Sequence, residues 1–213
     1  MDSDEQAIVI FGDVVGSRRA PGLASTWLRR LCRDLESLYL TDRRAPFAFT
    51  QGDELQGLLE PSADPVRAVL YAGLQDDARP MRWVVVFGSV APGEGPATEH
   101  GGQAFVRARD EIERARRQRD GLLMVTGDPR SDELLEDLAP VLAELLGSLS
   151  PRQRTVARLA LIDELRQAEV ADRLDVSRAT ISVTFARARV RSIERLAAAV
   201  RSTFAAGVRA AVA

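Results

Sequence analysis

The stretch RQAEVADRLDVSRATISVTFARAR, residues 166–189, decides the fold of the C-terminal third of the chain. Its pattern predicts a short helix, a tight turn and a second helix. Ala171 is small where the two helices cross, and Leu174 and Val176 fill the turn. Ser177 is expected to cap the second helix, because a serine hydroxyl accepts a hydrogen bond from a free amide of the first turn. The sequence therefore predicts a helix-turn-helix.

The second helix of this motif has two different faces. Ile181 and Phe185 are four residues apart and are expected to face the core. The opposite face carries Arg178, Ala179, Ser182, Val183 and Ala186. These small and polar residues are expected to face outward.

The motif resembles the helix-turn-helix of bacterial transcription regulators and of the promoter-reading region of sigma factors. It departs from them at Asp175, where glycine is commoner, although turn chemistry tolerates Asp. The resemblance implies that a helix over 177–190 enters the major groove of double-stranded DNA, with Arg178 and Ser182 nearest the base edges. Arg187, Arg189 and Arg191 would contact phosphates. The implied DNA-binding residues are Ser177, Arg178, Ala179, Ser182, Val183, Arg187 and Arg189.

Charge is distributed unevenly along the chain. Residues 149–213 contain 12 arginines and 6 acidic residues, whereas residues 1–148 contain 17 and 25. A basic module attracts phosphates, so this asymmetry favours DNA contact at the C-terminal end. Two alternatives remain open. The arginines can be a solvated surface, or the helix-turn-helix can dock a protein or a second copy of the chain.

Residues 1–148 alternate short apolar runs with helical stretches. The expected strands are 7–11, 47–50, 54–59, 83–87 and 122–125, and the expected helices are 23–40, 64–74 and 103–117. This order resembles the split βαβ ferredoxin-like arrangement, in which an antiparallel sheet carries its helices on one face. The predicted fold class is therefore α+β, with a ferredoxin-like antiparallel sheet domain followed by an all-α helix-turn-helix domain.

Two aspartates stand where neighbouring strands of such a sheet would end. Asp13 follows the first strand in IVIFGDVVGSR, and Asp53 lies on the hairpin in TQGDELQG. Paired carboxylates of this kind suit Mg²⁺ or Mn²⁺ that also carries substrate phosphates. Aspartate and glycine are also ordinary turn residues, so a hairpin without a metal remains open.

These segments resemble those of nucleotidyl cyclases. FGDVVGSR is similar to the first metal-binding segment of class III cyclases, and QGDELQGLL to their second and to the Gly-Asp-Glu corner of diguanylate cyclases. The resemblance implies that Asp13 and Asp53 hold metal ions against a triphosphate. In GGQAFVRARDEI, the Asn and Arg positions of cyclases fall on Phe105 and Arg109. Arg109 is therefore the candidate catalytic residue, while the missing Asn favours nucleotide or metal binding without turnover. Catalysis, regulatory binding and a purely structural scaffold all stay open.

A phosphate-binding loop is a further candidate feature of the same segment. Gly16, Ser17 and Arg18 can cradle a nucleotide phosphate through backbone amides and a guanidinium. Further candidate phosphate contacts are Arg82 and, on the charged helix, Arg107 or Arg109.

Composition excludes several function classes. The chain contains no lysine, which excludes a phosphate-loop lysine and a Schiff-base lysine. The only histidine, His100, lies in an expected loop, which argues against a Ser-His-Asp triad and a multi-histidine zinc site. The only cysteine, Cys32, falls in an amphipathic helical pattern and is expected to be a buried structural thiol.

A cytoplasmic protein without a membrane partner is expected. The apolar stretches fall well short of the roughly 18 residues that a membrane-spanning helix needs. The first residues, MDSDEQ, are acidic and lack the basic and apolar segments of a secretion signal.

Three segments are expected along the chain. They are a sheet domain over 1–128, a connecting helix over 129–148 and the helix-turn-helix domain over 149–213. Ser150-Pro151-Arg152-Gln153 predicts a capping box with proline at the first helical position. An apolar stripe from Ile193 to Phe204 predicts one more helix, which packs on the preceding helices or forms a two-fold homodimer. The final GVRAAVA is expected to fray.

Taken together, FGDVVGSR, GDELQGLL, GGQAFVRAR and the helix-turn-helix resemble the SatD family over almost the whole chain. The resemblance implies a cyclase-like sheet domain joined to a DNA-binding domain and carries no established activity. The first hypothesis is a DNA-binding transcriptional regulator whose N-terminal domain senses a nucleotide or a metal. The alternative is a Mg²⁺-dependent nucleotidyl cyclase or nucleotidyltransferase regulated by its helix-turn-helix domain.

Overall fold

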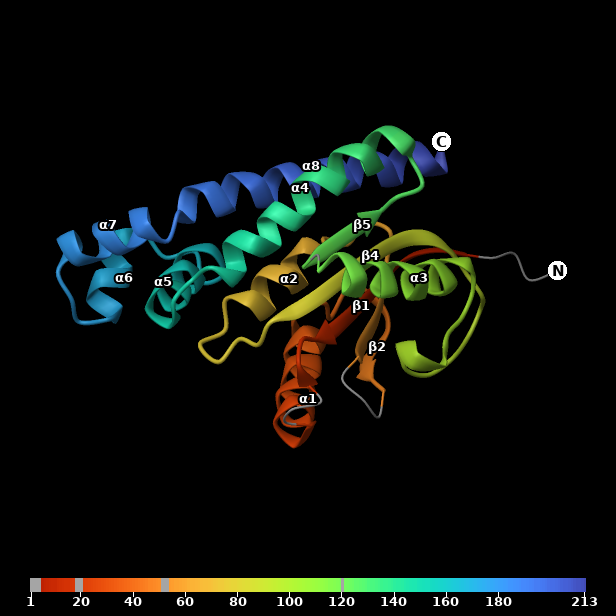
Figure 1. Cartoon of the computed structure of the whole chain (residues 1–213), viewed down its shortest axis with the longest axis horizontal. Helices are drawn as coiled ribbons and strands as arrows, with labels where there is room; N and C mark the ends of the chain where they lie inside the picture. The colour runs from red at the N-terminus through yellow and green to blue at the C-terminus, as the bar shows by residue number, and fades with distance from the viewer. Residues whose placement is uncertain (1–4, 18–20, 51–53, 120) are drawn as a thin grey trace.

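A five-stranded sheet forms the N-terminal body of the protein, whose computed structural model describes residues 5–17, 21–50, 54–119 and 121–213. The strands are β1 (Glu5–Val14), β2 (Arg43–Phe49), β3 (Glu54–Leu59), β4 (Met81–Val90) and β5 (Leu122–Val125). They lie in the order β2-β3-β1-β4-β5 (Figure 1). The first four pair antiparallel in a ferredoxin-like order, and β5 extends the sheet in parallel to β4. The predicted α+β fold is confirmed, with one parallel strand added.

Three helices connect these strands. Helix α1 (Pro21–Leu38) joins β1 to β2, α2 (Val66–Gly73) joins β3 to β4, and α3 (Gln103–Gln118) joins β4 to β5. A short 3-10 helix, η2 (Ala97–Glu99), lies in the loop before α3. The order of strands and helices is the one predicted from the apolar pattern.

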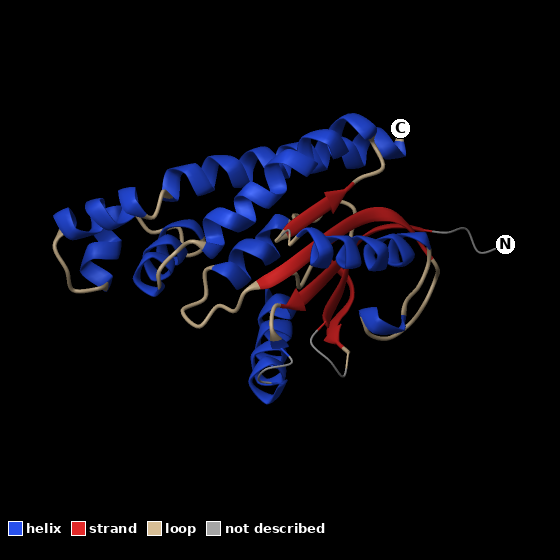
Figure 2. Cartoon of the chain, in the orientation of Figure 1, coloured by secondary structure: helices blue, strands red, loops and turns tan. Residues whose placement is uncertain are grey.

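The sheet is covered on both faces (Figure 2). Side chains of β1 alternate between faces, so Ile8 and Ile10 join the cluster under α1 and α2, whereas Ala7, Val9 and Phe11 join the cluster under α3. The expectation that all helices lie on one face is therefore wrong for α3. The physical reason is that the continuous apolar runs of β1 and β4 leave hydrophobic side chains on both faces, and each face needs a cover.

Five helices make up the rest of the chain. They are α4 (Pro129–Gly147), α5 (Pro151–Leu161), α6 (Gln167–Arg173), α7 (Arg178–Arg187) and α8 (Val190–Val212). The predicted capping box at the start of α5 is confirmed, because Ser150 accepts from the Gln153 amide and the Gln153 side chain accepts from the Ser150 amide. No helix within the described ranges is both long enough and apolar enough to cross a bilayer.

Helix α8 returns from the helix-turn-helix to the sheet domain and packs along α4 (Figure 1). Val200, Phe204 and Val208 belong to the same buried cluster as the sheet face under α1 and α2. Arg201 donates to Asp64, just before α2, at 2.5 Å. One hydrophobic core therefore includes residues from both sides of position 149, and the domain limits 1–128, 129–148 and 149–213 stay a prediction.

The expectation that the last residues fray is wrong. The α8 helix continues to Val212, and both Gly207 and Val208 are buried. A side chain at Gly207 would place its Cβ 2.3 Å from Thr126 Oγ1 and 2.7 Å from Ser131 Cβ. The absence of a side chain at this position lets the end of α8 approach the start of α4 closely.

This close approach predicts an unusual response to alanine. Alanine for glycine in a helix normally stabilises a protein by about 0.5–1 kcal/mol. At Gly207 the added methyl group would collide with Thr126, and overpacking costs about 1–3 kcal/mol. We expect Gly207→Ala to lower the free energy of unfolding measured in urea. The matched control Gly147→Ala, with nothing within 4 Å of its Cβ, should keep or raise it. A stabilised Gly207→Ala would show that α8 does not pack at this place.

A second prediction concerns the single thiol. Cys32 is buried on α1, and burial raises its pKa to about 12. The neutral thiol therefore prevails across the pH range 7–9, and the thiolate is the reactive form. We expect iodoacetamide to alkylate Cys32 only slowly in the native protein and rapidly in urea, as followed by mass spectrometry. Equal rates in both conditions would contradict a buried thiol.

Candidate functional site

The helix-turn-helix is formed by α6 and α7. Ser177 caps α7, because its Oγ accepts a hydrogen bond of 3.1 Å from the Thr180 amide. Asp175 has a φ of 50°, in the left-handed region that glycine adopts most easily, which explains why glycine is the commoner residue there. The Val176 amide donates to the Ala171 carbonyl across the turn at 3.1 Å. The predicted turn and cap are both confirmed.

A small separate core fixes the orientation of α7. Ile181 is fully buried, and it packs with Val170 and Ala171 of α6. Val156 and Leu159 of α5 complete this cluster, against which Phe185 is partly buried. Two helices, α5 and α6, therefore hold the inner face of α7, and its other face points outward.

The outer face of α7 is exposed as the sequence indicates. Its exposed residues are Arg178, Ala179, Ser182, Val183, Ala186 and Arg187. Val183 is an apolar residue that is 51% exposed. Within the described residues, Arg178 and Arg187 form no ion pair, so both guanidinium groups are available to an external anion. Helices α6 and α7 lie at the end of the molecule remote from the sheet (Figure 1).

The second helix of the motif is shorter than the sequence predicts. It ends at Arg187, and Arg189 has a φ of 52°, between the buried Ala188 and Val190. The physical reason is that the chain must change direction here to bury both Ala188 and Val190. The left-handed backbone of Arg189 provides this change before α8 begins. Arg189 and Arg191 therefore lie beyond α7, although both remain exposed.

A second group of charged side chains lies at the end of β1. Asp13 is 4% exposed and lies inside the strand rather than after it, because β1 stays paired as far as Val14. Its cross-strand neighbours are Glu54 on β3 and Arg82 on β4. The structure thus brings Asp13 next to Glu54, whereas Asp53 lies outside the described residues.

Arginines bind both oxygens of Asp13. Arg116 of α3 donates from Nη2 to Oδ1 at 2.9 Å and from Nε to Oδ2 at 3.3 Å, and Arg82 Nη1 donates to Oδ2 at 3.2 Å. This two-pronged hydrogen bonding to Asp13 raises the pKa of the Arg116 guanidinium. The carboxylate is therefore paired twice inside the protein.

Glu54 extends the same network. It is 8% exposed and accepts from Gln56 Nε2 at 2.9 Å. Arg109 Nη2 lies 3.7 Å from its Oε1, and Arg116 Nη2 lies 4.0 Å from its Oε2. The Arg109 guanidinium also lies over the Phe11 ring, 5.5 Å from its centroid. The candidate catalytic residue Arg109 is thus brought to Asp13 and Glu54. We call this pair of carboxylates, at the adjoining ends of β1 and β3, together with the arginines that contact them, the acidic edge.

The described donor set does not fit a divalent cation. Two guanidinium cations contact the Asp13 carboxylate, at the place where a metal would bind. Within the described ranges, no group of three acidic, histidine or cysteine side chains is arranged to hold a metal ion. Binding of Mg²⁺ or Mn²⁺ by Asp13 and Asp53 stays a prediction.

The predicted phosphate-binding loop is described only in part. Gly16 is exposed, with a φ of 75°, and Ser17 is half-buried. Arg18 lies outside the described residues. Among the further candidates, Arg82 contacts Asp13, and the exposed Arg107 pairs with the buried Glu111 of α3 at 2.8 Å.

Sequence reasoning missed two members of the acidic edge. Arg116 was not among the candidate residues, although it lies seven residues after Arg109, two helical turns along the same side of α3. Glu54 was not considered because the neighbouring Asp53 was the candidate metal ligand, although Glu54 begins the strand that pairs with β1. Helical spacing and strand pairing together are the signal that could have found them.

This geometry predicts the response of stability to a change at Asp13. Removing one partner of a buried ion pair costs about 3–5 kcal/mol. Because the Arg82 and Arg116 side chains are 19% and 35% exposed, we expect Asp13→Asn to cost less, about 2 kcal/mol. Urea denaturation without divalent metal measures this loss.

The opposite sign is expected from an empty metal site, where clustered carboxylates repel one another and an amide relieves the repulsion. A stabilised Asp13→Asn would therefore contradict the ion-pair account. The exposed Asp110→Asn on α3, which forms no ion pair among the described residues, serves as the control.

Comparisons with known proteins agree with the geometry of the C-terminal part. A family model described as sigma-70, region 4 matches residues 141–191, from the second half of α4 to the start of α8. No curated protein matches the chain.

Several solved structures have a similar arrangement over part of the chain. A bacterial light-regulated adenylyl cyclase aligns with 16% identity and a TM-score of 0.41 over 56% of this chain and 74% of its own. A second structure of such a cyclase aligns with 14% identity and a TM-score of 0.39 over 57% and 44%. A regulator of polyketide synthase expression from Bifidobacterium adolescentis aligns with 16% identity and a TM-score of 0.29 over 98% and 82%. At these TM-scores the three likenesses carry no argument about function, whereas residues 141–191 are similar to sigma-70 region 4 in sequence.

Proposed function

We propose that this protein binds double-stranded DNA through α7 and regulates transcription. The observation that carries the proposal is the capped, outward-facing α7 within a segment similar to sigma-70 region 4. A helix of this kind enters the major groove with the residues near its N-terminus at the base edges. Arg178 and Ser182 are therefore the proposed base-reading residues, and Ser177, Ala179 and Val183 lie beside them.

Charge and exposure support the phosphate contacts. Arg187 ends α7, and Arg189 and Arg191 follow at its junction with α8, all three exposed. Arginines flanking a helix in the groove position the protein on the DNA backbone, whereas base contacts select the sequence. The excess of 12 arginines over 6 acidic residues in 149–213 adds a general attraction to DNA.

The N-terminal domain is proposed to sense a small ligand. Its sheet belongs to the same core as α8, so a ligand that favours one arrangement of this core can bias DNA binding. A nucleotide is the ligand that the cyclase-like segments suggest. The SatD-family resemblance, a cytoplasmic location and a two-fold dimer that reads two half-sites belong to the same proposal.

Replacing Arg178 tests the base-reading role. A duplex is first selected by the wild-type protein from random sequences. Because a good base contact contributes about 1–3 kcal/mol of discrimination, we expect Arg178→Ala to lower the preference for the selected duplex over a scrambled one by about 5-fold to 150-fold. Fluorescence anisotropy at several salt concentrations measures both affinities.

Matched variants separate this effect from charge loss. Arg187→Ala should lower the affinity for both duplexes similarly, and it should reduce the salt dependence of binding by about one phosphate contact. Arg209→Ala, which removes the same charge near the far end of α8, should change neither. If the wild-type protein binds no duplex, or binds without salt dependence, the DNA proposal fails and docking of a protein partner replaces it.

A nucleotidyl cyclase or nucleotidyltransferase is the second candidate function. The observation that favours it is that Asp13, Glu54 and Arg109 lie together at the acidic edge. Phe105 speaks against turnover, because it is 7% exposed and packs edge-on against Phe11, with 6.1 Å between ring centroids, where cyclases have the Asn.

Product analysis distinguishes the two candidates. The protein is incubated with each nucleoside triphosphate and Mg²⁺ or Mn²⁺, and products are separated by chromatography. The regulator proposal expects no turnover. Turnover that Asp13→Asn and Arg109→Ala both abolish would establish the enzyme instead, while turnover that survives both would point to a contaminant.

A further inference from the structure

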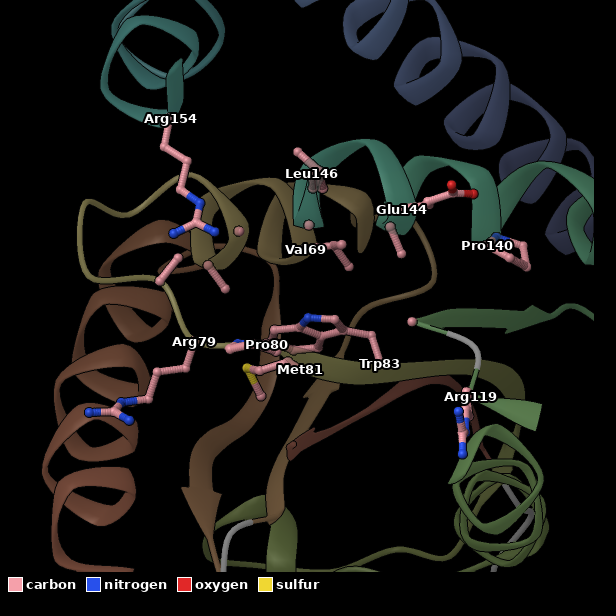
Figure 3. Close-up of a pocket in the computed structure, with 16 residues that line it drawn as sticks. Val69, Arg79, Pro80, Met81, Trp83, Arg119, Pro140, Glu144, Leu146 and Arg154 are labelled. Atoms are coloured by element: carbon pink, nitrogen blue, oxygen red, sulfur yellow. The ribbon is translucent and has the colours of Figure 1, made fainter. Parts of the chain in front are cut away.

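We propose that the cavity between α2, β4, α4 and α5 binds a small organic anion with a flat apolar body, and that this anion ties α5 to the sheet domain. This site is separate from the acidic edge around Asp13, and it lies where the helix-turn-helix joins the rest of the molecule. Figure 3 shows the residues that line it.

The cavity has the size and the apolar walls of a small-molecule site. Its volume is about 480 Å³, within the range of about 300–1,000 Å³ that such pockets have. The apolar lining residues are Val69, Ala72, Met81, Trp83, Ala143 and Leu146. Sheet, α2 and α4 all contribute to this lining, so an occupant contacts all three.

Trp83 provides a flat surface and one hydrogen-bond donor. Its indole ring lies under the cavity, with the ring nitrogen on the side toward Val69 (Figure 3). The side chain is only 3% exposed, and its N–H has no partner among the described residues. An aromatic or similarly flat group can stack on this ring.

Arg154 provides the positive charge. It projects from α5 toward the cavity (Figure 3), and its Nε is buried without a hydrogen-bond partner. Within the described residues, its guanidinium forms no ion pair. A partly buried guanidinium whose buried Nε lacks a partner is unfavourable, and a carboxylate or phosphate on the occupant would provide that partner.

The other charged lining residues do not neutralise Arg154. Arg79 has a buried, unpartnered Nε as well, but its side chain extends toward α1, away from Arg154 (Figure 3). Arg119 and Glu144 are exposed at the rim, and Glu144 is directed along α4, away from Arg154. The cavity therefore combines apolar walls with two arginines whose Nε atoms have no partner, of which Arg154 faces the cavity. This combination suits an anion rather than a neutral or cationic molecule.

The position of Arg154 gives the site a consequence for α5. The next residue, Thr155, donates to Asp76 at 2.8 Å, in the loop between α2 and β4. Ala157 of α5 also belongs to the core that includes the sheet. An anion on Arg154 would add a further link between α5 and the sheet domain beside this packing and this hydrogen bond. Stabilising this docked arrangement would favour the present orientation of α7 relative to the sheet, and its effect on DNA binding rests on the proposed function.

Direct binding tests the site without DNA. The full chain is titrated by calorimetry with 2-naphthoate and with 2-naphthyl phosphate, which share a flat body and differ in the anionic group. Neutral 2-naphthylmethanol and inorganic phosphate serve as probes for the body alone and the charge alone. We expect saturable one-to-one binding of at least one naphthyl anion, with both partial probes weaker by about tenfold or more.

Two arginine variants locate the binding. Arg154→Gln should lower the affinity for the naphthyl anion by about tenfold to a hundredfold. Arg152 is exposed two residues earlier on α5, and Arg152→Gln should leave this affinity unchanged. Without ligand, Arg154→Gln should unfold at the same or a higher temperature, because it removes a partly buried guanidinium whose Nε has no hydrogen-bond partner. A lower unfolding temperature with unchanged ligand binding would assign Arg154 a structural role and overturn the proposal.

Failure of the site and failure of the proposed function give different results. If neither naphthyl anion binds saturably, or both arginine variants lose affinity equally, the site is refuted whatever the protein does with DNA. If the anion binds but DNA affinity is the same with and without it, the site stands and its regulatory consequence is wrong.

Discussion

The packing of α8 along α4 is the interaction on which the rest of the structure depends. α8 begins beside α7 and ends against the start of α4, where Gly207 leaves room for Thr126 and Ser131. Val200 and Phe204 enter the core that α1 and α2 share with the sheet. A change in this core can therefore be carried along α8 to its junction with α7, which is the short turn at Ala188 and Arg189. Through this link, the ligand that we propose for the sheet domain could alter the DNA binding that we propose for α7.

Much of the fold was predictable, because its local signals are strong. The apolar runs of β1 and β4, the capping box at Ser150 and the cap at Ser177 each identify an element from a few residues. What could not be predicted depends on contacts between distant segments. The cover of the second sheet face by α3 and the docking of the last helical turns at Gly207 follow from packing that no single window of sequence reveals.

The candidate sites differ in the same way. The outer face of α7 follows from helical periodicity, and its exposed residues are those that the sequence indicates. The acidic edge depends on strand register and on which turn of α3 lies above it, so the pairing of Asp13 with Arg116 stayed hidden. Arg82 and Arg116 donate to the oxygens of Asp13, so this carboxylate is part of a buried ion-pair network. Phe105, at the position where cyclases have the Asn, is buried in the core under α3. The described part of this edge thus resembles a stabilised scaffold more than a metal centre.

The central claim is that α7 reads DNA while the sheet domain remains outside the groove. A crystal structure of the protein bound to a duplex that it selects from random sequences tests this most directly. The account predicts α7 in the major groove, with Arg178 at a base edge and Arg187 near a phosphate. DNA bound on another face of the molecule, or α7 turned to solvent in the complex, would contradict it.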